Sequence, residues 1–143
     1  MKKTVILFSL AFSLFACGNA QTKSDANTAV EEAAVEAQKP AVQALNQSDL
    51  ATKLQEENVV LIDVRTPGEV SSGYIKGANK FIDINGASFE SDIKALDKSK
   101  TYVMYCRSGG RSGRAAEFMV SNGFTTVYNL LGGISSYSGE VVK

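Results

Sequence analysis

The chain has 143 residues, of which 44% are hydrophobic and 21% are charged, and this length supports one packed domain and little more. Its 15 basic residues balance its 15 acidic ones, so no basic excess points to nucleic acid as a partner. Histidine is absent, which excludes Ser-His-Asp and Cys-His catalysis and histidine-ligated metals. The two cysteines, Cys17 and Cys106, are too few for a disulfide framework or a four-thiolate site. We therefore expect no metal and no cofactor.

Residues 1–16 are predicted to be a signal peptide. Lys2 and Lys3 give the segment a basic start, and an apolar run from Thr4 to Ala16 follows. This run has the length of a signal-peptide core and is too short to span a membrane. We therefore expect the protein to be exported.

The cysteine that follows the apolar run predicts a lipid anchor. Residues 14–17 read Leu-Phe-Ala-Cys and resemble the bacterial lipobox, in which a diacylglycerol is joined to the cysteine sulfur and the chain is cleaved just before it. The resemblance implies that Cys17 carries the lipid. The two acyl chains of a diacylglycerol would meet the requirement that stable anchoring needs more than one chain. We then expect the protein on the periplasmic side of a membrane or in the cell envelope. The alternative is an ordinary signal peptide with a chance cysteine near its cleavage site.

Residues 17–40 are predicted to be a flexible linker behind this anchor. The stretch is small, polar and acidic, and Val30 and Val35 are its only branched apolar residues. It cannot bury enough apolar surface to offset the entropy of ordering. A partner-binding helix over residues 29–38 is the alternative, although no apolar stripe gives that helix a docking face.

Alternating strands and helices are predicted for the remaining domain, residues 41–143. Apolar runs typical of strands lie at 42–45, 59–64, 80–84, 101–105 and 125–128. Helices are expected from Ser48 to Glu57, after a capping box at 66–69 with Pro67 first, at 89–96, and at 111–121 before an Asn-Gly cap. The alternation implies an α/β fold with a parallel sheet, whose ligands bind beyond the carboxyl ends of the strands.

The segment from Cys106 to Ser112, C-R-S-G-G-R-S, is the chemical centre of the sequence. It lies between a buried strand and a helix start, and its glycines let successive N–H groups point inward. These amides, the helix end and the guanidinium groups of Arg107 and Arg111 favour the Cys106 thiolate and lower its pKa. The same field suits an anionic substrate in sulfur or phosphoryl transfer. A buried cysteine before a glycine-rich turn is the structural alternative.

Four motifs resemble those of the rhodanese domain in order and spacing. They are LIDVRTPGE at 61–69, GYIKGAN at 73–79, YCRSGGRS at 105–112 and LGG at 131–133. The resemblance implies a rhodanese-like three-layer fold, with helices on both sides of a parallel five-stranded sheet. Tyr74, Lys76 and Tyr137 stand where the family usually has His, Pro and often Trp.

The resemblance implies a single-domain sulfurtransferase with Cys106 as its nucleophile. Cys106 would take the outer sulfur of a donor such as thiosulfate, become a persulfide, and pass the sulfur to a thiol or another nucleophilic acceptor. The residues implied to bind the donor are Arg107, Ser108, Gly109, Gly110, Arg111 and Ser112. Asp63 and Arg65 are expected to brace this loop, or to pair with a nearby acid such as Glu69.

Two other functions stay open at this point. A phosphatase or arsenate reductase of the related fold has one more residue in its loop and commonly has Arg at the sixth position after the cysteine. Here Arg111 is at the fifth position and Ser112 at the sixth. A non-catalytic persulfide carrier or sulfur-binding module is the second alternative, because an intact Cys106 does not separate a carrier from an enzyme.

The expected compartment suggests partners. An exposed low-pKa thiol outside the cytoplasm is at risk of oxidation, so some reductant must reach Cys106. A membrane-tethered thioredoxin-like protein is our hypothesis for the thiol acceptor or reductant. The other expected partners are a small sulfur anion and, through the lipid anchor, a membrane.

Overall fold

Five parallel strands form the central sheet of the structure, a computed structural model that describes residues 40–143. In chain order the elements are β1 (Gln43–Leu45), α1 (Gln47–Lys53), β2 (Val59–Asp63), α2 (Pro67–Ser71), β3 (Tyr74–Ile75), β4 (Ala78–Phe81), α3 (Phe89–Lys94), β5 (Thr101–Tyr105), α4 (Gly110–Ser121), β6 (Val127–Leu130), a 3-10 helix (Gly133–Ser136) and β7 (Val141–Val142). The predicted signal peptide, lipidation site Cys17 and linker lie on residues 1–39, outside the described residues, apart from Pro40.

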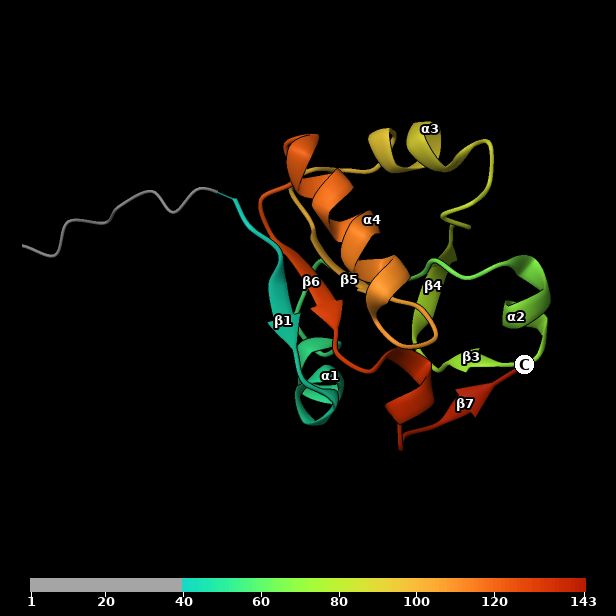
Figure 1. The fold of residues 1–143 in the computed structure, drawn as a ribbon. Helices are drawn as coiled ribbons and strands as arrows, with labels where there is room; N and C mark the ends of the chain where they lie inside the picture. Colours follow the sequence, from blue (N-terminus) through green and yellow to red (C-terminus); the bar gives the residue numbers. More distant parts are fainter. Residues whose placement is uncertain (1–39) are drawn as a thin grey trace, which may run out of the picture. The chain divides into compact units, whose positions relative to one another are not determined.

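The sheet has the strand order β1-β6-β5-β2-β4, with β5 in the middle between β6 and β2 (Figure 1). All four neighbouring pairs are parallel, and β2 aligns with β5 from Val59↔Thr101 to Asp63↔Tyr105. The α/β class and the five-stranded parallel sheet are therefore confirmed. The carboxyl ends of β2 and β5 come out side by side at one edge of the sheet.

Helices cover both faces of the sheet, and each face has its own apolar core. In Figure 1, α3 and α4 lie on one side, and α1 and the 3-10 helix lie on the other. The core on the α3 and α4 side consists mainly of Val60, Ile62, Val64, Phe89, Ile93, Tyr102, Met104, Ala115, Ala116, Met119, Phe124 and Val127. The core on the other side consists of Leu45, Leu50, Leu61, Ile75, Val103, Tyr105 and Leu130. Burial of apolar surface on both faces fixes the position of the central strands.

The period of two along β5 decides where the cysteine points. Tyr102 and Met104 face the α3 and α4 side, whereas Val103 and Tyr105 face the opposite side. Cys106 continues this alternation and is 1% exposed within the α3 and α4 core. A one-residue shift of β5 would turn the thiol to the other face of the sheet.

The starts of α1 and α2 differ in how well local sequence predicts them. The capping box of Thr66 and Glu69 forms as predicted, with Pro67 in the first turn of α2. The prediction that Ser48 caps α1 is wrong, because Asn46 holds that position and the Ser48 hydroxyl donates to Asp49 Oδ1 inside the helix. The helix also ends at Lys53 rather than at Glu57.

Strands β4 and β6 are displaced from the predicted runs. β4 ends at Phe81, but the N–H groups of Ile82 and Ile84 still donate to the carbonyl groups of residues 63 and 64. β6 spans Val127–Leu130 rather than 125–128, because Phe124 is buried just after the helix cap and the ladder begins only beyond it.

A small antiparallel pair, β3 with β7, was not predicted from the sequence. It joins Tyr74 to Val142 and Ile75 to Val141. Both strands have only two residues, which gives too short a pattern for sequence analysis to detect. Within residues 40–143, no helix is long and apolar enough to cross a membrane.

Candidate active site

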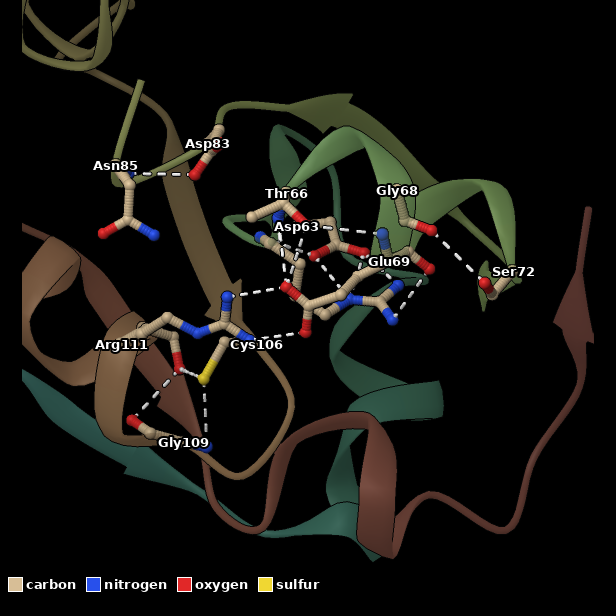
Figure 2. A network of polar contacts seen from close by, with 12 residues as sticks. Asp63, Thr66, Gly68, Glu69, Ser72, Asp83, Asn85, Cys106, Gly109 and Arg111 are labelled. Atoms are coloured by element: carbon tan, nitrogen blue, oxygen red, sulfur yellow. Dashed lines mark hydrogen bonds and ion pairs between the residues drawn. The ribbon is translucent and has the colours of Figure 1, made fainter. Parts of the chain in front are cut away.

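Cys106 lies at the carboxyl end of β5, where the chain turns into α4 (Figure 2). It is the free cysteine of the described residues, and its side chain is buried at the base of the loop. Arg107, Ser108 and Gly110 are exposed at the rim, whereas Gly109 and Ser112 are buried. The predicted loop therefore surrounds the sulfur with a mixture of buried donors and exposed cationic residues.

Hydrogen-bond donors converge on the Cys106 sulfur. The Gly109 N–H donates to Sγ at 3.2 Å, and the Ser112 hydroxyl lies 3.5 Å from Sγ. Burial alone would raise the pKa of the thiol, but the Ser112 side chain and the N–H groups of Ser112, Gly109 and Ser108 outweigh it. The pKa of Cys106 is therefore lowered, as the sequence predicts, without any histidine.

Glycine is required at position 109 by the backbone. Gly109 has φ of 100° and serves as the N-cap of α4 with no side-chain cap. A Cβ atom there would approach the carbonyl oxygen of Leu130 to 3.4 Å. The left-handed conformation is what turns the Gly109 N–H back toward the sulfur.

Asn129 holds the loop from the neighbouring strand β6, a role not predicted from the sequence. Its Nδ2 donates to the carbonyl of Gly109 at 3.1 Å, and its Oδ1 accepts from Ser112 Oγ at 2.7 Å. The single Ser112 hydroxyl proton therefore has three acceptors within reach, Asn129 Oδ1, the Gly109 carbonyl at 3.1 Å and the Cys106 sulfur. The only sequence signal was an amide residue between Tyr128 and Leu130 in an otherwise apolar run.

The segment that begins at Gly133 supports the loop from below. The N–H of Ile134 donates to the carbonyl of Cys106 and the N–H of Ser135 to that of Arg107, both at 2.9 Å. Gly133 has φ of 53°, and a Cβ atom there would overlap the Cys106 carbonyl oxygen. The L-G-G motif thus lies directly behind Cys106.

Arg111 is held at the mouth of the loop by an acid from α2. Its Nη1 and Nη2 donate to the two carboxylate oxygens of Glu69 at 2.7 and 2.6 Å. In Figure 2 the Arg111 side chain passes the Cys106 sulfur and ends at Glu69. The pKa of Arg111 is raised, first by this hydrogen bond and also by the nearby Cys106, and the pKa of Glu69 falls to about 2.

Asp63 and Arg65 form a buried ion pair at the neighbouring strand end. Arg65 Nε donates to both carboxylate oxygens of Asp63, at 2.9 and 3.0 Å, and Nη2 also donates to the carbonyl of Gly73 at 2.8 Å. Burial works against the Arg65 charge, but Asp63 raises the pKa of the guanidinium overall. The acid that pairs with Arg65 is therefore Asp63, while the carboxylate of Glu69 pairs with Arg111.

The site contains the groups for thiol chemistry. No cluster of three metal-ligating side chains occurs within residues 40–143. The fold and the site thus define an α/β domain in which a strand end places a thiol of lowered pKa against loop amides.

The family model of the rhodanese-like domain matches residues 46–140. The chain therefore belongs to the rhodanese-like domain family, and its relatives include named sulfurtransferases. A sulfurtransferase of Allochromatium vinosum is 32% identical over 98 residues, covering 68% of this chain and 89% of that protein. The thiosulfate sulfurtransferase GlpE of Pseudomonas fluorescens is 34% identical over 95 residues, covering 64% and 84%.

Two further matches support the same family. An uncharacterized Bacillus subtilis protein, YqhL, is 37% identical over 81 residues, or 57% of this chain, and the match spans 62% of that protein's own length. Among solved structures, a rhodanese-related protein from Thermoplasma volcanium has a TM-score of 0.61 and 30% identity, covering 70% of this chain and 97% of that one. The solved structure supports the rhodanese-like fold, and the named sulfurtransferases support a sulfur-transfer family for the chain.

Proposed function

We propose that this protein is a sulfurtransferase that carries sulfane sulfur as a persulfide on Cys106. The observation that carries the proposal is the sulfur itself, buried at the end of β5 with the Gly109 N–H and the Ser112 hydroxyl directed at it. These donors favour a thiolate and would equally stabilise the charge of a terminal persulfide sulfur. The named sulfurtransferase relatives support the same chemistry.

In the first half-reaction, the Cys106 thiolate attacks the outer sulfur of a donor such as thiosulfate. A sulfur–sulfur bond forms to Sγ, and the bond between the outer sulfur and the sulfite group breaks. Sulfite leaves with the electron pair, so no proton is needed and the absence of histidine is no obstacle. The exposed guanidinium of Arg107 is proposed to attract the anion, and the loop amides are proposed to hold the transferred sulfur.

In the second half-reaction, a nucleophile such as a thiolate or cyanide attacks the outer persulfide sulfur. The new bond forms to the acceptor, and Cys106 leaves as the thiolate that its donors already stabilise. Asp63 and Arg65 are proposed to brace this arrangement from the neighbouring strand end. They act on the loop only indirectly, because their hydrogen bonds go to each other and to the chain at Glu69 and Gly73.

The test is thiosulfate:cyanide sulfurtransferase activity of the full chain beside Cys106→Ser. Mass spectrometry of the Cys106 peptide checks for an added sulfur of about 32 Da, so that Cys17 does not contribute. We expect turnover and a Cys106-dependent mass shift. A mass shift without turnover would favour the carrier alternative. The absence of both turnover and a mass shift, on folded and reduced protein, would overturn the proposal.

We further propose that the protein is exported and lipid-anchored through Cys17, with residues 17–40 as a linker. The basic start, the apolar run and the lipobox-like residues 14–17 support this. Cells fed an alkyne fatty acid should label the wild-type protein and not Cys17→Ser. A wild-type protein that stays unlabelled contradicts the anchor.

A thioredoxin-like protein is proposed as the thiol acceptor or reductant for this exported site. The reason for this proposal is the expected location outside the cytoplasm, where a low-pKa thiol needs protection from oxidation. The persulfidated protein, mixed with a reduced thioredoxin-like protein, should lose its added sulfur and release sulfide. Retention of the sulfur in that mixture contradicts the proposed partner.

A further inference from the structure

The Glu69 carboxylate is a point of contact between the cap of α2 and the mouth of the cysteine loop. One of its oxygens, Oε2, accepts from the N–H and the hydroxyl of Thr66, at 3.3 and 3.1 Å, and closes the capping box. Both oxygens accept from the Arg111 guanidinium, at 2.6 and 2.7 Å. Four donors therefore fix this carboxylate in place beside the active-site loop.

The pair of Arg111 and Glu69 lies at the partly exposed edge of the cysteine loop. The side chains of Arg111 and Glu69 are 23% and 32% exposed, so neither is part of the buried core. Within residues 40–143, Arg107 on the same loop takes part in no ion pair. The charges at the mouth are thus two guanidinium groups, one carboxylate and the Cys106 thiolate, which sum to zero.

We propose that Glu69 is a specificity-determining residue that compensates the charge of Arg111 and thereby limits how strongly the site favours highly anionic donors. This inference rests on the proposed function, because it concerns which sulfur donors reach Cys106. A dianion such as thiosulfate must compete with a carboxylate that already holds both Nη atoms of Arg111. A donor with less negative charge, such as the persulfide of a small thiol, meets no such competition.

The capping box makes a clean substitution available. Either Glu or Gln at the third helical position can accept from the N-cap residue, so Glu69→Gln retains the cap on Thr66 while it removes the charge facing Arg111. Glu90→Gln is the matched control. Glu90 is also a helix glutamate in an ion pair, with Lys94 at 3.1 Å on α3, which packs at the other end of α4 (Figure 1).

Alkylation of Cys106 by two reagents of different charge measures the effect without any sulfur chemistry. Iodoacetate carries one negative charge and iodoacetamide carries none, and both react with the same thiolate. The ratio of their rates therefore cancels any change in the pKa or nucleophilicity of the thiol. Reaction of the full chain is followed on the Cys106 peptide by mass spectrometry, at low ionic strength.

We expect Glu69→Gln to raise the iodoacetate to iodoacetamide rate ratio about three- to tenfold, the size expected for one partly exposed charge near the reacting atom. The increase should shrink in about 0.5 M salt, and Glu90→Gln should leave the ratio unchanged. An unchanged ratio in Glu69→Gln overturns the proposal. A lower ratio overturns it too, because Glu69 would then serve to position Arg111 for the anion rather than to compensate it.

The unmodified protein gives a second measurement that does not depend on a folded variant. Because the charges at the mouth cancel, the wild-type rate ratio should change less than about twofold between low salt and 0.5 M salt. A steep fall of the rate ratio with salt would mean that the positive charge around Cys106 is not compensated, and it would overturn the proposal.

Thiosulfate kinetics then distinguish this inference from the proposed function. If the protein turns over thiosulfate, Glu69→Gln should lower KM for thiosulfate severalfold more than KM for a persulfide of lower charge. Turnover with an unchanged alkylation ratio refutes the role of Glu69 and leaves sulfur transfer intact. A raised ratio with neither turnover nor a Cys106-dependent mass shift refutes sulfur transfer and leaves the charge compensation intact.

Discussion

Two strand-to-helix junctions lie side by side at the carboxyl edge of the sheet. They differ in how the backbone N–H groups at the helix start find hydrogen-bond acceptors. After β2, side chains do this work: Thr66 and Glu69 form the capping box, and Asp63 accepts from both the backbone and the side chain of Arg65. After β5, Gly109 caps α4 without a side chain, and its N–H is directed at the Cys106 sulfur.

The difference explains why chemistry is expected at one junction and not at the other. At the start of α2 the Glu69 carboxylate accepts from the Thr66 N–H and the Thr66 hydroxyl accepts from the Glu69 N–H, so these donors are not available to a second anion. The start of α4 lacks such an internal acceptor, so its donors remain available to the thiolate and to a transferred sulfur. A glycine in the place of a capping side chain is what keeps this junction open.

The largest expected effect comes from a substitution at the junction after β2. Asp63→Asn should lower the free energy of unfolding by about 3–5 kcal/mol, because it leaves the Arg65 guanidinium buried beside an uncharged amide. Urea unfolding followed by circular dichroism measures the change. The exposed pair of Glu90 with Lys94 gives a control, since Glu90→Gln should shift stability by no more than about 0.5 kcal/mol. A loss below about 1 kcal/mol in Asp63→Asn would show that the pair is not a brace.

The role of the glycine cap at the junction after β5 can be tested with substitutions at two neighbouring glycines. Gly109→Ala should cost about 1–3 kcal/mol and slow the reaction of Cys106, because φ of 100° strains any residue with a Cβ atom and the N–H would turn away from the sulfur. Gly110 begins α4, and a Cβ there meets nothing within 4 Å. Gly110→Ala should therefore fold and react like the wild type. Equal effects of the two substitutions, in urea unfolding and iodoacetamide kinetics, would contradict this assignment.

A smaller effect is expected on the titration of the thiol. The pKa of Cys106 is lowered, so its alkylation rate should reach half its maximum at a lower pH than that of an ordinary thiol. Ser112→Ala removes a donor to the thiolate and should move this midpoint upward. Ser91→Ala, an exposed serine on α3, is the control. A midpoint that stays fixed in Ser112→Ala would place the stabilisation in the amides alone.

The smallest expected effect concerns acid stability at the contact between the two junctions. The pKa of Glu69 is lowered from 4.5 to about 2, because Arg111 and Thr66 favour its charged form. A lowered carboxyl pKa gives stability that is present above pH 4.5 and is lost as the pH falls toward 2. The stability difference between wild type and Glu69→Gln should stay below about 1 kcal/mol and shrink over that range. A difference that grows on acidification would contradict the sign.

Local sequence patterns correctly predicted the features that depend on a single contiguous segment. β5 spans residues 101–105 as predicted, because an apolar run ends at a polar glycine-rich turn, and Asn122 and Gly123 end α4 as predicted. The cysteine loop was found in the same way, since its residues are contiguous. The thiolate-favouring environment of Cys106 followed from that loop alone.

Contacts between distant segments were out of reach. The partners Glu69 and Arg111 are 42 residues apart, and each had a sufficient local interpretation, one as a capping residue and the other as an anion-steering side chain. Asn129 contacts the loop only because β6 lies beside β5 in the sheet. Such pairings depend on strand order, which the sequence pattern of any one element does not specify.

The 3-10 helix behind Cys106 also has a consequence for the order in which the site is made. Ribosomal synthesis releases Cys106 well before Ile134 and Ser135, whose N–H groups hold the carbonyls of Cys106 and Arg107. The backbone support behind the loop is therefore completed only when that later segment docks.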